Sequence, residues 1–138
     1  MRKYGLKKDR EDLRDKIWYS SQFKTAASLP QQVDLRGKCS PIVDQGELGS
    51  CTANAIASGL REYLELQSGK SFIQLSRLFL YYEERKLEGD VNQDDGAEIR
   101  DGMKVLNQLG VCPEKEDPYK IKAFTQAPTT QDMRDAIP

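Results

Sequence analysis

A cysteine at the start of a small, apolar segment is the residue of this sequence best suited to chemistry. Cys51 follows a turn that contains Gly46, Gly49 and Ser50, and it opens a stretch that favours a helix. The positive end of a helix dipole favours thiolate over thiol, and the thiolate is the nucleophile. Gln45 lies six residues upstream, where its carboxamide can donate to a developing oxyanion. This spacing indicates a nucleophilic thiol with an oxyanion donor across a glycine turn.

The motif around the cysteine resembles the opening of a papain-family cysteine peptidase. Its core is Gln45-Gly46-Glu47-Leu48-Gly49-Ser50-Cys51, preceded by Val33 to Arg36 and Pro41 to Asp44. Weaker similarities follow in the family's order, at Leu75-Ser76, Asp95-Gly96 and Pro118-Tyr119, so that the resemblance covers residues 33–137. It implies that Cys51 is the nucleophile, and that Gln45 and the Cys51 backbone amide form the oxyanion hole. The competing interpretation is a buried, inert cysteine in an unrelated soluble helical domain.

The resemblance also implies a set of substrate-binding residues. Gly96 matches the second glycine of the family's Asn-Gly-Gly segment, whose backbone pairs with an extended substrate, while Asp95 replaces the first. Ala97 and Glu98 would border the pocket for the substrate's second residue, which favours a basic or polar side chain there. The full implied set is Gly49, Ser50, Asp95, Gly96, Ala97 and Glu98.

The chain contains no histidine. A papain-like mechanism needs an imidazole to take the thiol proton and return it to the leaving amine. We therefore interpret the chain as the nucleophile-bearing half of a cysteine endopeptidase, inactive alone, whose base comes from a missing right-domain half in cis or in trans. The alternative from another class is a non-catalytic, peptidase-derived module that binds a protein partner.

Fold and domain organisation follow from the same reading. We expect a mostly α structure, the helical left domain of the α+β papain-like fold over residues 30–138, with a central helix from Cys51 and the β-barrel half absent. Residues 1–29 carry eight Lys/Arg and four Asp/Glu, a net +4 against −5 for the remainder. They are predicted to form a short leader that docks on the body and occupies the cleft until it is removed; a merely solvated charged segment is the alternative.

Periodicity and end signals predict four helices and one strand. The helices are expected over about 50–68, 76–89 and 97–109, with a fourth that starts at a capping box near Thr129, and a short strand is expected near Ile42-Val43. The second helix is predicted to turn its charged residues to solvent: Glu83, Glu84, Arg85, Lys86 and Glu88.

Composition excludes several other classes. A formal net charge of −1 gives no support for nucleic-acid binding. Apolar residues never form the roughly 18-residue run of a membrane span, and no signal peptide is recognisable, so we expect a soluble protein. Asp90, Asp94 and Asp95 lack the spacing of an EF-hand, and we expect neither a metal nor a cofactor.

Three cysteines are too few for a disulfide scaffold, and one must stay unpaired. Leu48 occupies the place where papain-like enzymes usually hold a disulfide cysteine, so that bridge cannot form. Cys39 and Cys112 are either paired as a substitute or both reduced. A Cys39–Cys112 bridge would close a loop of roughly 70 residues and contribute about 4 kcal/mol on chain-entropy grounds.

Overall fold

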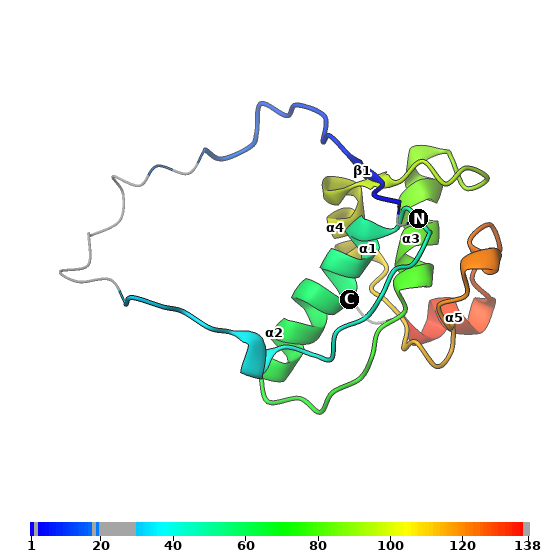
Figure 1. Ribbon diagram of the computed structural model, residues 1–138. Coiled ribbons are helices and arrows are strands. Elements are labelled where there is room, and N and C mark those ends of the chain that lie inside the picture. Colours follow the sequence, from blue (N-terminus) through cyan, green and yellow to red (C-terminus); the bar gives the residue numbers. More distant parts are fainter. Residues whose placement is uncertain (2, 18, 20–29, 137–138) are drawn as a thin grey trace.

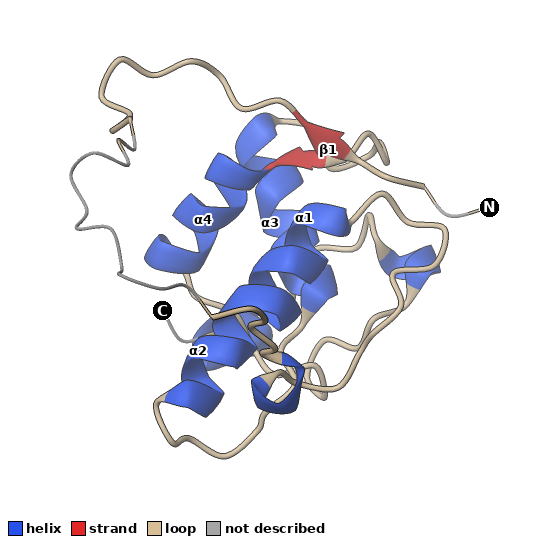
Figure 2. Cartoon of the chain, turned by 60° about the vertical axis from the view of Figure 1, so that its left-hand side comes forward, coloured by secondary structure: helices blue, strands red, loops and turns tan. Residues whose placement is uncertain are grey.

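A continuous helical segment that begins at the cysteine forms one side of the fold. The computed structural model describes residues 1, 3–17, 19 and 30–136. The segment comprises α1 (Cys51–Ala53), the π-helical η3 (Asn54–Arg61) and α2 (Glu62–Gln67). It packs against α3 (Arg77–Glu88) and α4 (Ile99–Gln108), which also pack on each other (Figures 1 and 2). The helix-rich body agrees with the predicted papain-like left domain.

Local signals set the ends of these helices. The Ser76 hydroxyl caps α3 by accepting from the Phe79 backbone N–H at 3.0 Å, and α3 ends at Gly89, whose φ is 81°. The last helix, α5 (Thr130–Asp135), opens with the predicted capping box between Thr129 and Asp132. The second and fourth helices therefore start where the sequence places them.

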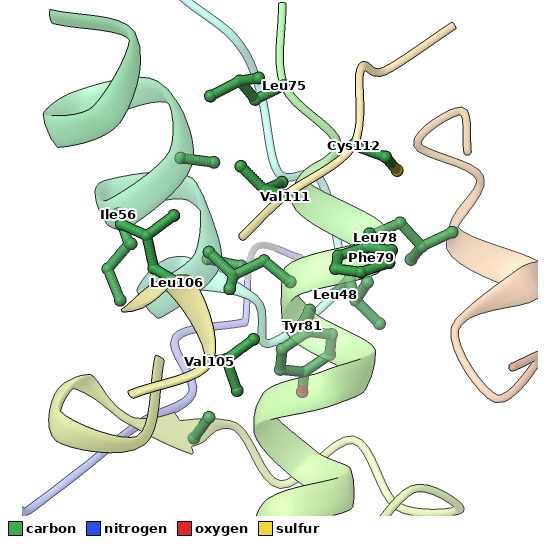
Figure 3. Packing of buried hydrophobic residues seen from close by; sticks show 14 residues of the cluster. Leu48, Ile56, Leu75, Leu78, Phe79, Tyr81, Val105, Leu106, Val111 and Cys112 are labelled. Atoms are coloured by element: carbon green, nitrogen blue, oxygen red, sulfur yellow. The ribbon is translucent and has the colours of Figure 1, made fainter. Parts of the chain in front are cut away.

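Fourteen side chains form one continuous hydrophobic cluster between the helices (Figure 3). Leu48, which stands where papain-like enzymes usually have a disulfide cysteine, is 2% exposed and belongs to the hydrophobic core. Burial of this kind stabilises the fold by roughly 25 cal/mol per Å² of apolar surface. The members are Leu48, Ala53, Ile56, Ala57, Leu75, Leu78, Phe79, Leu80, Tyr81, Ala97, Val105, Leu106, Val111 and Cys112.

The strands lie elsewhere than predicted. β1 (Leu6–Lys7) pairs in parallel with β2 (Ala97–Glu98), in the register Leu6 to Ala97 and Lys7 to Glu98. The N-terminal segment therefore packs on the helical body, where it pairs with the two residues that immediately precede α4 (Figure 2). The predicted strand at Ile42-Val43 is wrong: Ile42 is fully exposed, and neither residue pairs with β1 or β2, the strands of the described part of the chain. Short 3-10 turns complete the fold at η2 (Arg36–Lys38) and η4 (Ile121–Ala123).

The predicted solvent-facing side of α3 is wrong for three of its five residues: Lys86 is exposed and Glu88 half-buried, whereas Glu83, Glu84 and Arg85 are buried. Glu83, Glu84 and Arg85 are 4%, 0% and 0% exposed, because neighbouring segments enclose the helix on both sides. The Arg85 guanidinium lies over the Tyr81 ring and donates to backbone carbonyls of the 91–93 segment. A buried charge thus anchors the turn between α3 and β2.

Within the described ranges, every helix is too short or too polar to cross a bilayer.

Candidate active site

Cys51 is the first residue of the long helical segment and is partly exposed. Ser50 precedes it with φ −91° and ψ 31°, and the Ser50 carbonyl accepts the Asn54 backbone N–H at 3.0 Å. The thiol therefore lies at the amino-terminal end of a helix, accessible to solvent. This is the position that the sequence predicts for it.

The Gln45 carboxamide is already engaged with backbone carbonyls. Its Nε2 donates to the Lys3 carbonyl oxygen at 2.8 Å and to the Leu48 carbonyl oxygen at 3.0 Å. The second bond fixes the side chain against its own turn. The first bond joins the Gln45 side chain to the N-terminal segment, outside the turn.

A tyrosine that the sequence analysis did not assign to the site holds the nucleophile turn. Tyr119 donates its hydroxyl to the Gln45 carbonyl oxygen at 3.0 Å and also hydrogen-bonds the Ser50 hydroxyl. Ser50 is fully buried, and its hydroxyl also accepts from Asn54 Nδ2 at 3.0 Å. Burial raises the pKa of Tyr119, which keeps its hydroxyl protonated as a donor. Ser50, implied to bind substrate, thus uses its side chain within the turn.

Arg77 fixes the same turn from the start of α3. Its guanidinium lies 4.0 Å from the centre of the Tyr119 ring, and NH1 donates to the Asp44 carbonyl at 3.2 Å and to Asn54 Oδ1 at 3.1 Å. NH2 pairs with Glu114 at 3.1 Å. A lone arginine ahead of the apolar run Leu78 to Tyr81 is the sequence signal that could have identified this role.

The second turn of the site carries Asp94, Asp95 and Gly96. Gly96 is buried with φ 83°, and its backbone N–H donates to the Tyr81 hydroxyl at 3.2 Å. Gly49 is buried on the facing turn and donates its N–H to Asp94 Oδ1 at 2.9 Å. The structure therefore brings Gly49 and Gly96 to one place, whereas the Asp95 side chain is exposed.

The N-terminal segment passes between these two turns. Gly5 is buried, and a Cβ there would lie 2.2 Å from the Gly49 carbonyl oxygen and 2.6 Å from the Gly96 Cα. The Ala97 backbone N–H donates to the Gly5 carbonyl at 2.8 Å, just ahead of the β1–β2 pairing. The leader backbone thus occupies the edge where an extended substrate is expected, and only glycine fits that gap.

Basic leader side chains face acidic groups beside this edge. Lys7 Nζ lies 2.7 Å from Glu88 Oε2, and Arg10 Nε lies 3.5 Å from Glu98 Oε1. Ala97 is fully buried and Glu98 is 8% exposed. A separate pocket of about 410 Å³ is lined by Tyr4, Ile42, Val43, Asp44, Gln45 and Asn54.

The bridge between Cys39 and Cys112 is not formed, because all three cysteines are free thiols. Cys39 is exposed and its thiol donates to the Leu35 carbonyl at 3.3 Å, whereas Cys112 is wholly buried in the core. Burial raises the pKa of Cys112 to about 12, which makes it a poor thiolate. Among the described residues, His, Cys, Asp and Glu side chains form no group of three suited to a metal ion.

Comparison with known proteins finds relatives of the class that the cysteine motif predicts. No family model matches the chain. A curated relative from Acanthamoeba polyphaga mimivirus, an uncharacterized peptidase C1-like protein, is 35% identical over 157 residues, covering 96% of this chain and 50% of its own length. Xylellain, a cysteine protease from Xylella fastidiosa, is 41% identical over 99% of this chain and 56% of its own, with a TM-score of 0.82. The chain is homologous to papain-like cysteine peptidases.

More distant papain-like structures share the fold. Procathepsin L 3 of the Tenebrio molitor larval midgut aligns with a TM-score of 0.58 at 23% identity, over 82% of this chain and 36% of its own. The ragweed cysteine protease Amb a 11 in its proform aligns with a TM-score of 0.62 at 21% identity, over 80% of this chain and 33% of its own. The chain spans about half the length of the curated relative it matches.

Proposed function

We propose that this chain is the nucleophile-bearing half of a papain-like cysteine endopeptidase. Cys51 attacks the substrate carbonyl, and the Gln45 carboxamide together with the Cys51 backbone amide holds the oxyanion. The observation that carries this proposal is the Gln45 side chain, which donates to the Leu48 carbonyl inside the turn that leads to Cys51 and to the Lys3 carbonyl of the N-terminal segment. Gly49, Ser50, Asp95, Gly96, Ala97 and Glu98 form the surrounding substrate face.

The general base comes from outside these residues. The chain has no histidine, the residue that takes the thiol proton and returns it to the leaving amine in this mechanism. Support for a docking half comes from the exposed segment before the nucleophile turn, where Val33, Leu35 and Ile42 are 71%, 46% and 100% exposed. Exposed apolar side chains of this kind suit burial by a right domain that contributes the imidazole, in cis or in trans.

Residues 1–29 act as an inhibitory leader in this proposal. The Lys3 carbonyl takes the Gln45 donor, and Gly5 fills the gap between Gly49 and Gly96, so substrate backbone cannot enter. Two of the structural neighbours were themselves solved as proforms. Residues 2, 18 and 20–29 of the leader lie outside the described residues.

The groove favours a peptide with a basic or polar second residue. The acidic groups Glu88 and Glu98 border the edge at Ala97, and in this structure they are paired with Lys7 and Arg10 of the leader. A substrate that displaces the leader can offer the same charges.

Hydrolysis of a dipeptidyl fluorogenic substrate tests the half-enzyme proposal. The purified 138-residue chain is expected to give no turnover above a Cys51→Ala control, because a helix terminus activates the thiol but cannot protonate the leaving amine. Turnover by the chain alone that is lost in Cys51→Ala would contradict it.

The same exposed side chains also suit a second function, a non-catalytic module that binds a protein partner through Val33, Leu35 and Ile42. An evolved module would run as one monodisperse species on size exclusion. An orphan half would self-associate or require its partner.

A further inference from the structure

We infer that Asp94 is a positioning residue that clasps the nucleophile turn to the substrate-binding turn. Its carboxylate joins the backbone N–H of Gly49, two residues before Cys51, to the hydroxyl that holds Gly96. This inference rests on the proposed function, since the two joined turns are the ones that bear the nucleophile and align the substrate.

The clasp is a chain of three hydrogen bonds through two side chains. Gly49 N–H donates to Asp94 Oδ1 at 2.9 Å, and the Tyr81 hydroxyl donates to the same oxygen at 2.7 Å. The Tyr81 hydroxyl in turn accepts from the Gly96 N–H at 3.2 Å. Charge-assisted bonds to a carboxylate are roughly twice as strong as neutral ones. Displacing Asp94 therefore releases Gly49 and removes the hydrogen bond that orients the Tyr81 hydroxyl under Gly96.

The surroundings make this arrangement rigid. Tyr81 is fully buried, and burial together with the Asp94 carboxylate raises the pKa of its hydroxyl, so that it remains a donor. Arg85 lies over the Tyr81 ring and holds the Val91 and Gln93 carbonyls at 2.7 and 3.1 Å, which fixes the backbone that leads to Asp94. Position 48 is a core leucine, so no thiol is available there to link the two turns covalently.

The contact between Gly49 and Asp94 leaves no room for a side chain at position 49. A Cβ on Gly49 would lie 2.9 Å from Asp94 Oδ1 and 3.5 Å from the Tyr81 hydroxyl. Gly49 is therefore the residue that lets the carboxylate reach the backbone of the nucleophile turn. This gives a glycine in the cysteine motif a specific partner.

The other carboxylate oxygen of Asp94 serves the leader. Lys3 Nζ lies 3.1 Å from Asp94 Oδ2 and also donates to the Asp94 carbonyl. Because the leader uses Oδ2 and the clasp uses Oδ1, the clasp persists when the leader leaves. Two substitutions separate these roles: Asp94→Asn keeps an Oδ1 acceptor without the charge that pairs Lys3, and Asp94→Ala removes both.

Amide hydrogen exchange of the ¹⁵N-labelled 138-residue chain tests the clasp. In Asp94→Ala we expect exchange at Gly49 and Gly96 to accelerate about tenfold, the equivalent of about one hydrogen bond, while Leu80 and Leu106 in the helices keep their rates. Asp94→Asn should retain most of the protection at Gly49, with its amide proton resonance moved upfield because the acceptor has lost its charge. Lys3→Ala and Asn92→Ala are matched controls that leave Gly49 unchanged.

Unchanged exchange at Gly49 in Asp94→Ala would overturn the inference, as would an equal acceleration in Lys3→Ala. If Asp94→Ala fails to fold, Asp94→Asn decides, and an unmoved Gly49 resonance rejects the clasp. Tyr81→Phe gives an independent check, since it should accelerate Gly96 more than Gly49. These readouts require no peptidase activity, so a chain that clasps correctly but never supports hydrolysis would refute the proposed function alone.

Discussion

Arg77, Glu84 and Arg85 lie on α3 with at most 5% of their surface exposed. Each has partners of a kind that helical periodicity cannot predict: Arg77 reaches the nucleophile turn, Arg85 reaches backbone carbonyls, and Glu84 accepts from the Thr52 hydroxyl at 2.7 Å. A charged run in a sequence favours a solvated face, and that prediction fails here because α3 has packed neighbours on both sides. Buried charges with such partners are costly to alter.

Glu84 should make the stability of the chain depend on pH. Burial raises the pKa of its carboxyl from 4.5 to about 8, and the Thr52 hydrogen bond offsets this only in part. The folded state therefore holds a proton that the unfolded state releases, and the stabilisation present below pH 4.5 is lost as the pH rises to about 8. Between pH 6.5 and 8 the free energy of unfolding should fall by up to about 1.4 kcal/mol per pH unit.

Urea unfolding at several pH values measures this slope. Glu84→Gln keeps the shape without the proton and should flatten the curve above pH 6.5. The choice of window matters because burial also raises the pKa of Asp117, to about 6, and its own contribution is lost mostly below this range. Equal slopes in wild type and Glu84→Gln would show that Glu84 is ionised in the folded chain.

Arg77 should contribute to stability as well as to the site. Arg77→Met leaves Glu114 without its Arg77 ion pair and removes one donor to the Asp44 carbonyl, at a cost of about 3 kcal/mol in the free energy of unfolding. The exposed Arg134 offers a matched control, and Arg134→Met should stay within about 0.5 kcal/mol of wild type. Chemical denaturation measures the free energy of unfolding of both variants. Similar losses in the two would show that Arg77 does not stabilise the nucleophile turn.

At the scale of elements, helices were predictable and strands were not. Ser76, Gly89 and Thr129 act within a few residues of the helix ends they set, so the sequence displays them directly. β1 and β2 pair residues about 90 positions apart, and each strand has only two residues, too few for a periodic pattern. The leader and the body thus meet through a contact that only the folded chain makes visible.

Gly5→Ala tests how tightly this contact depends on shape. The added methyl group would meet backbone atoms of Gly49 and Gly96, which cannot move aside as a flexible side chain would. We expect the leader to detach, so that the Ala97 amide, which donates to Gly5, exchanges about tenfold faster. Cys51 should also react faster with iodoacetamide, relative to the exposed Cys39 as an internal reference.

Gly37→Ala is the matched control, because a Cβ at Gly37 meets nothing within 4 Å. It should leave both the Ala97 exchange rate and the Cys51 labelling ratio as in wild type. A Gly5→Ala chain with unchanged Ala97 exchange would mean that the leader does not depend on this gap.

At the scale of the whole molecule, the motif predicts Cys51 and Gln45 as site residues, whereas the residues that hold the turn between them are visible only in the fold. Cys51 and Gln45 lie within seven residues of sequence, so their relation is local. Asp94, Tyr119 and Arg77 reach the turn from 33 to 74 positions away, through hydrogen bonds whose partners no local pattern reveals. The motif therefore predicts which residues would do the chemistry, and only the folded structure shows which residues hold the nucleophile turn.

The exposed apolar side chains of Val33, Leu35 and Ile42 should promote self-association of the chain. We expect the 15.7 kDa chain to elute from size exclusion at a concentration-dependent, larger apparent mass, since isolated apolar patches self-associate. Val33→Ser combined with Ile42→Ser should shift it towards the monomer. A strictly monodisperse wild-type chain would instead favour the protein-binding module.

The central claim is that this chain supplies the nucleophile and oxyanion donor of a peptidase and lacks only the half that carries the base. Its most direct test is a fusion of residues 1–138 to the part of xylellain that the alignment leaves uncovered, assayed on a dipeptidyl fluorogenic substrate after the leader is removed. The account predicts turnover that the unfused chain lacks, abolished by Cys51→Ala and reduced about 100-fold or more by Gln45→Ala. A cooperatively folded fusion without Cys51-dependent turnover would contradict it.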